Sequence, residues 1–156
     1  MSNIKTLQKV VGIAEKRRDE ALTALAQVQR EWILAQEQME QLKAYAKEAE
    51  DRWILRSGAG VDAALLHHHR HFMQKVEHAI EFQRGVLQQR ETLVERSRSQ
   101  VYAAERDVAG LKKYTERKQQ ALDLKALRQE QKTTDEMALN IHMRQSLART
   151  QQGLRS

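Results

Sequence analysis

The sequence contains no cysteine and no proline, and only 4% of its 156 residues are aromatic. Without cysteine, the chain can form neither a disulfide framework nor a thiolate metal site, which permits a reducing compartment. So few aromatic residues provide too little mass for a compact globular core. The sequence also has no apolar run long enough to cross a bilayer and no signal-peptide pattern after Met1. We therefore expect a soluble protein with no transmembrane segment.

The residues that are abundant favour long helices. Ala, Leu, Glu, Lys, Arg and Gln dominate a chain that is 31% charged, and this profile is typical of coiled coils. Gly58 and Gly60 form the only closely spaced pair of glycines, and glycine permits positive φ angles that a helix does not use. We interpret this stretch as a reversal in which Ser57 and Gly58 end one helix and Asp62 is the N-cap of the next.

A 4-3 heptad repeat runs through the first third of the chain. It averages 3.5 residues per turn and therefore keeps one seam facing a partner helix, which predicts a helix over residues 3–56. Several seam residues are alanine, so we expect the stabilising contacts at Leu25, Val28, Trp32, Leu42 and Trp53. The complete seam, in which only Arg18 is polar, comprises Leu7, Val11, Ala14, Arg18, Ala21, Leu25, Val28, Trp32, Ala35, Met39, Leu42, Ala46, Ala49 and Trp53.

A second heptad repeat follows the predicted turn over residues 57–61 and indicates a long helix over residues 62–132. One seam position is mostly apolar: Met73, Ile80, Leu87, Val94, Val101, Val108, Thr115 and Leu122. Its companion is more polar: Val76, Gln83, Arg90, Ser97, Ala104, Leu111, Lys118 and Lys125. Polar seam residues lower stability but can fix the register.

Folding the chain back at the glycines pairs residues whose numbers add up to about 118. In this register Leu42 lies near Val76 and Leu25 near Val94, so apolar residues meet along the seam. An intermolecular dimer through the same seams is the alternative. The glycine turn favours a monomeric hairpin over a homodimer, because linkage raises the effective concentration of the partner helix.

The C-terminal tail is basic. Lys112–Ser156 contains ten Lys or Arg and five Asp or Glu, so the tail carries most of the net charge of +6. A basic tail favours an acidic protein surface, anionic lipid or nucleic acid, and a solvated face with no partner is the alternative. Thr133 and Glu136 fit a capping box, which predicts a hinge near Lys132 and a terminal helix over residues 134–150.

These patterns together predict an all-α fold. The expected structure is a long antiparallel two-helix coiled-coil hairpin with an overhanging C-terminal helical tail, in a single domain of residues 1–156. The apolar face of the terminal helix has no partner within the chain, so this helix either frays or docks onto another protein.

No catalytic motif, phosphate-binding loop or cofactor site is present in the sequence. His67 and His71 are four residues apart on a predicted helix and could share a metal ion, but no further ligand is nearby, so we expect exposed histidines and no metal site. Two helices do not easily enclose a cavity that excludes water. We therefore expect a protein that is not an enzyme.

Three stretches of the sequence carry distinctive motifs. The first is Ala35–Tyr45, with Gln-x-x-x-Leu-x-x-Tyr at its end. The second is Phe72–Ile80, with Phe-x-x-x-Val-x-x-Ala-Ile, and the third is Gln131–Ala138, with Gln-Lys-x-x-Asp-Glu-x-Ala. In these stretches the sequence resembles the family of the bacterial flagellar type III export protein FliJ. The order and separation of the stretches, the glycine reversal and the basic tail also fit. The chain departs from the family pattern at Ala49, where an aromatic is common, and at Gln83, where a His is common.

The resemblance implies a non-enzymatic stalk similar to the central stalk of rotary ATP synthases. Family members bind the hexameric flagellar export ATPase and promote ring assembly. They also bind the cytoplasmic domain of the transmembrane export gate protein, and they interact with export chaperones. The resemblance thus implies a location in the cytoplasm, peripheral to the inner face of the cell membrane at the flagellar base. It implies no cofactor and no nucleic acid.

The resemblance also suggests partner-binding residues. Carried over by matching positions, the surface for the export gate comprises Gln38, Leu42, Tyr45, Phe72, Val76 and Ala79. Leu42 and Val76 are seam residues, whereas Tyr45 and Phe72 lie beside the seam and are better candidates for a partner contact. The far end of the hairpin would face the ATPase ring. There we expect a basic collar of Arg17, Arg18, Lys112, Lys113, Arg117 and Lys118.

Two other functions fit the same sequence. One is the equivalent stalk protein of a virulence injectisome, which differs little in sequence pattern from the flagellar protein. The other is a coiled-coil arm that binds nucleic acid, which the basic tail supports and the sparse aromatics and interspersed acids disfavour.

Overall fold

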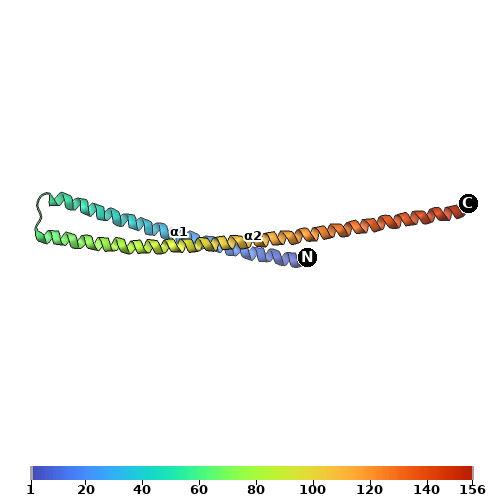
Figure 1. Cartoon of the computed structure of the whole chain (residues 1–156), viewed down its shortest axis with the longest axis horizontal. Helices are drawn as coiled ribbons and strands as arrows, with labels where there is room; N and C mark the ends of the chain where they lie inside the picture. Colours follow the sequence, from blue (N-terminus) through green and yellow to red (C-terminus); the bar gives the residue numbers. More distant parts are fainter. Residues whose placement is uncertain (1, 156) are drawn as a thin grey trace. The chain divides into compact units, whose positions relative to one another are not determined.

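Two α-helices make up almost the whole chain. The computed structural model describes residues 2–155, in which α1 spans Ser2–Ser57 and α2 spans Ala63–Arg155 (Figure 1). No strand occurs among these residues, and the two helices run antiparallel and pack against each other. The predicted fold class, an all-α antiparallel hairpin with a C-terminal helical extension, is confirmed. No helix within residues 2–155 is long and apolar enough to span a membrane.

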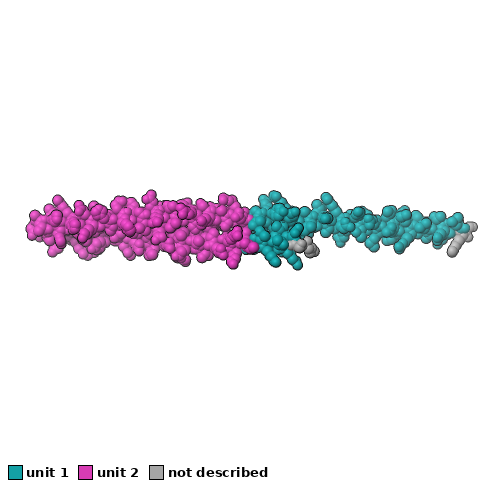
Figure 2. Space-filling view, turned by 90° about the horizontal axis from the view of Figure 1, so that it is seen from below, with its two compact units in different colours: residues 1–12, 109–156 teal, residues 13–108 magenta. Residues whose placement is uncertain are grey.

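The chain divides into two compact units, each containing part of both helices (Figure 2). One unit is Ile13–Val108 and includes the turn. The other unit combines Met1–Gly12 with Ala109–Ser156. The single domain expected over residues 1–156 stays a prediction.

The reversal between the helices has the expected chemistry. The amides of Ala59 and Gly60 donate to the last carbonyls of α1, and Gly60 adopts φ +92°, a conformation that side-chain-bearing residues rarely tolerate. The Asp62 carboxylate accepts a 2.8 Å hydrogen bond from the amide of Leu65, and its carbonyl accepts from the amide of Leu66. Asp62 is therefore the N-cap of α2, as predicted.

Replacing Asp62 with alanine should lower the free energy of unfolding by about 1 kcal/mol, because the first-turn amide of Leu65 loses its acceptor. Chemical denaturation followed by far-UV circular dichroism measures this loss. The control is Asp51→Ala, at an exposed position within α1, which should change stability by less than about 0.5 kcal/mol. Equal effects of the two substitutions would contradict the capping role.

The predicted seam of α1 is the face that the helix buries. Every seam position from Leu7 to Trp53 is buried or half-buried, whereas most other positions of α1 are exposed. Ala35 and Met39 are the most enclosed seam residues of the first helix, at 3% and 5% exposure. On α2, within the Ile13–Val108 unit, Val76, Val94 and Val101 are buried at the predicted spacing of the seam. Each such valine stabilises the hairpin by roughly 1.5 kcal/mol or more.

Two polar residues of the α2 seam bond directly to α1. Gln83 is 8% exposed, and its Nε2 donates to the carbonyl of Ala35 at 2.8 Å and lies 3.4 Å from Oε1 of Gln38. Arg90 Nη1 donates to Glu31 Oε2 at 3.3 Å. These pairs agree with the predicted register to within about one helical turn. A one-heptad slip would bring Gln83 opposite the larger Val28 or Leu42 and away from the small Ala35, whose carbonyl its amide reaches, so this residue disfavours other alignments.

In the second unit, the start of α1 packs on α2. Ile4 is buried and Leu7 half-buried on the first helix, and Leu111 and Thr115 are half-buried on the second. From residue 116 to residue 154 every position of α2 is exposed. The predicted seam therefore ends at Thr115. Lys118, Leu122 and Lys125 continue the heptad pattern but are exposed.

The hinge predicted near Lys132 is absent, because α2 continues through it to Arg155 without interruption. The hydroxyls of Thr133 and Thr134 donate to the carbonyls of Gln129 and Glu130, four residues earlier, at 2.9 and 3.0 Å. Threonine in this arrangement sits inside a helix and does not cap one. The Thr133–Glu136 pattern was therefore wrongly interpreted as a helix start.

Candidate functional site

The six residues expected to contact a partner lie on both helices close to the turn, within the Ile13–Val108 unit. We call them the near-turn patch: Gln38, Leu42, Tyr45, Phe72, Val76 and Ala79. The aromatic rings of Tyr45 and Phe72 meet across the two helices, with centroids 6.0 Å apart and an interplanar angle of 70°. This edge-to-face contact shows that the hairpin register brings the two halves of the patch together.

Burial divides the patch into two groups. Val76 is only 7% exposed, and Leu42 and Ala79 are half-buried, so these three side chains pack the hairpin. Tyr45 is 51% exposed and Phe72 38%, and Gln38 is exposed beside Gln83. Tyr45, Phe72 and Gln38 are therefore the accessible part of the patch. The two rings contact each other and still present apolar area to solvent.

An aromatic stack that the sequence did not predict lies between the patch and the turn. The indole of Trp53 stacks on the imidazole of His69 with centroids 4.1 Å apart and an interplanar angle of 4°. The Nε2 atom of His69 lies 3.5 Å from a carboxylate oxygen of Glu50, and the His69 side chain is only 14% exposed. The expectation of exposed histidines is thus wrong for His69. The predicted register places Leu65 opposite Trp53, and His69 lies one helical turn further along α2, so the sequence pattern alone did not identify this stack.

The histidine cluster does not assemble a metal site in the part of the chain that the structure describes. No group of three or more His, Cys, Asp or Glu residues that could hold a metal ion occurs within residues 2–155. His67 is exposed, and His71 lines a groove beside the turn. The cluster therefore contributes imidazole groups to a surface.

That groove, which we call the turn groove, has a volume of about 350 Å³. Its apolar wall is formed by Trp53, Leu65 and Phe72. Its polar residues are Arg56, His68, His69, His71 and Lys75. An adjacent hollow of about 210 Å³ is lined by Tyr45, Glu48, Ala49, Arg52, Trp53, Arg56, His69 and Phe72. Phe72 therefore belongs to the near-turn patch and to both hollows.

The residues of the expected basic collar fall in both units. Arg17 and Arg18 belong to Ile13–Val108, and Arg18 forms an ion pair with Asp19 at 3.1 Å. Lys112, Lys113, Arg117 and Lys118 belong to the other unit. There the ammonium of Lys118 lies 5.8 Å from the centre of the Tyr114 ring, within the range of a cation–π contact.

A second groove, of about 320 Å³, lies within the unit that holds the tail. Its walls come from the start of α1 and from α2 near the point where the seam ends: Asn3, Ile4, Thr6, Leu7, Tyr114, Lys118 and Leu122. Lys118 is therefore the one collar residue among its walls. Leu122, which continues the heptad pattern beyond Thr115, is 41% exposed here.

Comparison with models of protein families yields a match over nearly the whole chain. The matching model is described as flagellar FliJ protein, and it covers residues 3–147. This range includes the near-turn patch, the turn and the greater part of the exposed extension of α2. No curated protein matches the sequence.

Proposed function

Because the chain belongs to the FliJ family, a non-catalytic component of the flagellar export apparatus, we propose that it is the stalk of the flagellar type III export ATPase complex. In this proposal it binds the hexameric export ATPase through one end of the hairpin and the cytoplasmic domain of the transmembrane export gate protein through the near-turn patch. It works as a monomer in the cytoplasm, peripheral to the inner face of the cell membrane at the flagellar base. Export chaperones are further partners.

The observation that carries the proposal is the exposed Tyr45–Phe72 pair. Both rings come from positions that the family resemblance assigns to the export gate contact, and they meet across α1 and α2. Aromatic side chains supply most of the binding energy in many interfaces, whereas Leu42, Val76 and Ala79 support them from the seam. The patch therefore combines accessible anchors with a rigid base.

The proposed contact with the ATPase uses the exposed part of α2 and the basic collar. The α2 residues from 116 to 154 are exposed on all sides, and a helix of this kind gains stability when a partner covers it. The basic side chains Lys112, Lys113, Arg117 and Lys118 lie where this extension begins, and Arg17 and Arg18 are on α1. Basic groups at this end favour an acidic rim on the ring.

Adding the chain to the cognate flagellar export ATPase should raise the rate of ATP hydrolysis in a saturable manner, because the stalk stabilises the assembled ring. Turnover is measured at a fixed ATPase concentration with increasing amounts of the chain. The variant chain with both Arg117→Glu and Lys118→Glu should reach half-maximal stimulation of ATP hydrolysis only at a higher concentration than the parent chain. The matched control, Lys43→Glu and Lys47→Glu, changes two exposed lysines of α1 outside the collar. Unchanged turnover together with no copurification would contradict the stalk role.

Two other functions compete with this one. The match to a flagellar family model favours the flagellar system over a virulence injectisome. A nucleic-acid-binding arm would bind any duplex with an affinity that falls steeply as salt rises. We expect no such binding at moderate salt.

A further inference from the structure

The turn groove has an apolar wall and a basic rim. We propose that it binds an acidic protein segment that inserts one large apolar side chain between Trp53, Leu65 and Phe72. The turn groove shares only Phe72 with the near-turn patch, so this docking site is distinct from the proposed contact with the export gate. Binding of the acidic segment requires neither the export gate nor the ATPase.

The apolar wall is large enough to hold a side chain. The groove measures about 350 Å³, at the lower end of the range typical of ligand pockets. Leu65 is 38% exposed and Phe72 also 38%, and Trp53 is half-buried between the helices. An inserted leucine or phenylalanine would cover these exposed apolar atoms, and its own apolar surface would be removed from water, which stabilises the complex.

One wall of the groove is fixed before any partner arrives. Trp53 is stacked flat on His69 with ring centroids 4.1 Å apart, and Nε2 of His69 lies 3.5 Å from a carboxylate oxygen of Glu50. The indole therefore already packs against a neighbouring ring in the free chain. A preformed wall lowers the entropy lost on binding, because the side chain does not have to be ordered by the partner.

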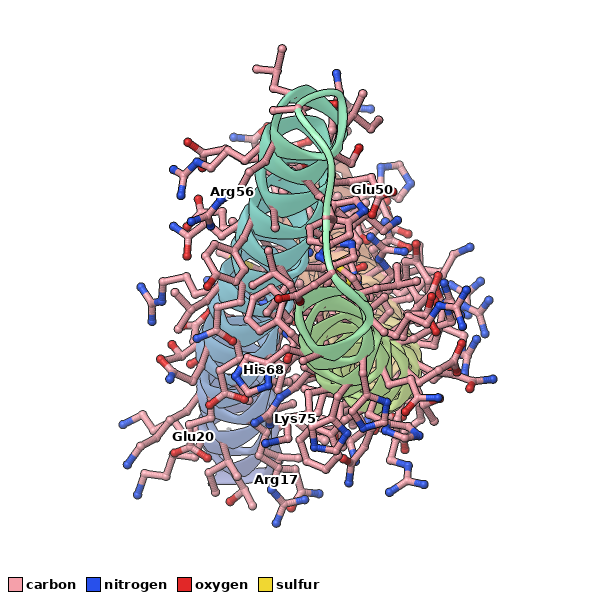
Figure 3. All side chains as sticks on the ribbon, turned by 90° about the vertical axis from the view of Figure 1, so that its left-hand side faces the viewer. Arg17, Glu20, Glu50, Arg56, His68 and Lys75 are labelled. Atoms are coloured by element: carbon pink, nitrogen blue, oxygen red, sulfur yellow. The ribbon has the colours of Figure 1, made fainter. Side chains whose placement is uncertain are left out.

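The charge of the rim identifies the partner as acidic. Arg56 and Lys75 line the groove, His68 and His71 add imidazole N–H donors, and no Asp or Glu is among the lining residues. His68 and Lys75 lie together beside the two helices, apart from Glu50 (Figure 3). The adjacent hollow differs, because its Arg52 is paired with Glu48 at 2.8 Å. Uncompensated cations around an apolar hollow favour carboxylates that flank an apolar residue.

A peptide fits this shape better than a membrane or a nucleic acid. Lipid headgroups and duplexes are bound by broad basic surfaces that meet many phosphates. Here only two permanent cations surround a concave site whose wall is apolar. A short acidic segment with one anchor residue satisfies both features at once.

Fluorescence of Trp53 provides the test. Trp53 is the only tryptophan in a Trp32→Phe variant of the full chain. An acidic hexapeptide with one central leucine, and with both termini blocked, is titrated into this variant. We expect a saturable change in emission. Replacing the leucine by alanine, or the acidic residues by their amides, should weaken binding about tenfold, the equivalent of roughly 1.4 kcal/mol. The double substitution Arg56→Gln and Lys75→Gln should weaken it to a similar degree.

Two variants locate the site. Lys43→Gln with Lys47→Gln removes the same charge outside the groove and should leave peptide binding unchanged. Tyr102→Ala should also leave it unchanged, because Tyr102 is exposed on α2 and does not line the turn groove. The proposal is overturned by equal binding of the acidic and neutral peptides, by unchanged binding in the Arg56 and Lys75 variant, or by no binding. Competition by phosphatidylserine vesicles or duplex DNA at equal charge would assign the groove to those ligands and also overturn it.

Discussion

Replacing Tyr45 and Phe72 together with alanine should weaken binding to the cytoplasmic domain of the export gate by about 30-fold or more, the equivalent of roughly 2 kcal/mol. The two rings are 51% and 38% exposed and meet edge to face, so both can enter a partner's surface. The fold should survive, because neither ring is buried in the seam. Loss of their mutual contact costs about 1 kcal/mol of stability. Binding is measured by calorimetry with the isolated gate domain, and helix content by circular dichroism.

A matched control tests whether any loss of gate binding comes from the near-turn patch or from the removal of any two exposed aromatic rings. Phe82 and Tyr102 are 75% and 57% exposed, belong to the same unit and lie outside the near-turn patch. The double substitution Phe82→Ala and Tyr102→Ala therefore removes the same two ring types from the surface of α2. It should leave gate binding unchanged. If both double variants bind equally well, the near-turn patch is not the gate contact.

The buried face of each helix could be predicted because it depends on periodicity alone. A 4-3 repeat fixes which side of a helix is apolar, and the only way for one chain to cover two such sides is to fold back at Gly58 and Gly60. The register then follows from the length of the turn. For this reason the sequence could predict both that Tyr45 meets Phe72 and that the two rings, which lie beside the seam, stay accessible.

The parts that could not be predicted depend on side-chain geometry between the helices. Nothing in the sequence specifies that the amide of Gln83 reaches the carbonyl of Ala35, or that His69 lies flat on Trp53 and thereby forms one wall of a groove. Both contacts join residues far apart in the chain. They require the rotamers as well as the register.

The error at Thr133 has a different cause. A capping box stabilises a helix start only where the preceding residues leave the helical conformation, and no glycine or proline near Lys132 makes them do so. The threonine hydroxyl has an equally good acceptor in the carbonyl of Gln129 while the helix continues. A local motif therefore fails where the surrounding residues all favour helix.

Replacing Val94 with aspartate should lower the free energy of unfolding by roughly 3 kcal/mol or more, because it buries an unpaired carboxylate in the seam. Val94 is 8% exposed, and the register places it near Leu25. The arginines one turn away on either side, Arg90 and Arg98, are already paired with Glu31 and Glu95. The hydroxyl of Ser97, three residues further along α2, is buried without a hydrogen-bond partner, but it is neutral and offsets only part of the hydration that the new charge loses.

Thermal unfolding followed by circular dichroism should show the Val94→Asp variant melting about 10 °C below the parent chain. Val10→Asp is the matched control, because Val10 is 37% exposed and its substitution leaves the carboxylate in water. This second variant should melt within a few degrees of the parent. If both melt alike, the seam through Val94 does not hold the two helices together, and the near-turn patch would lose the rigid hairpin on which its two halves depend.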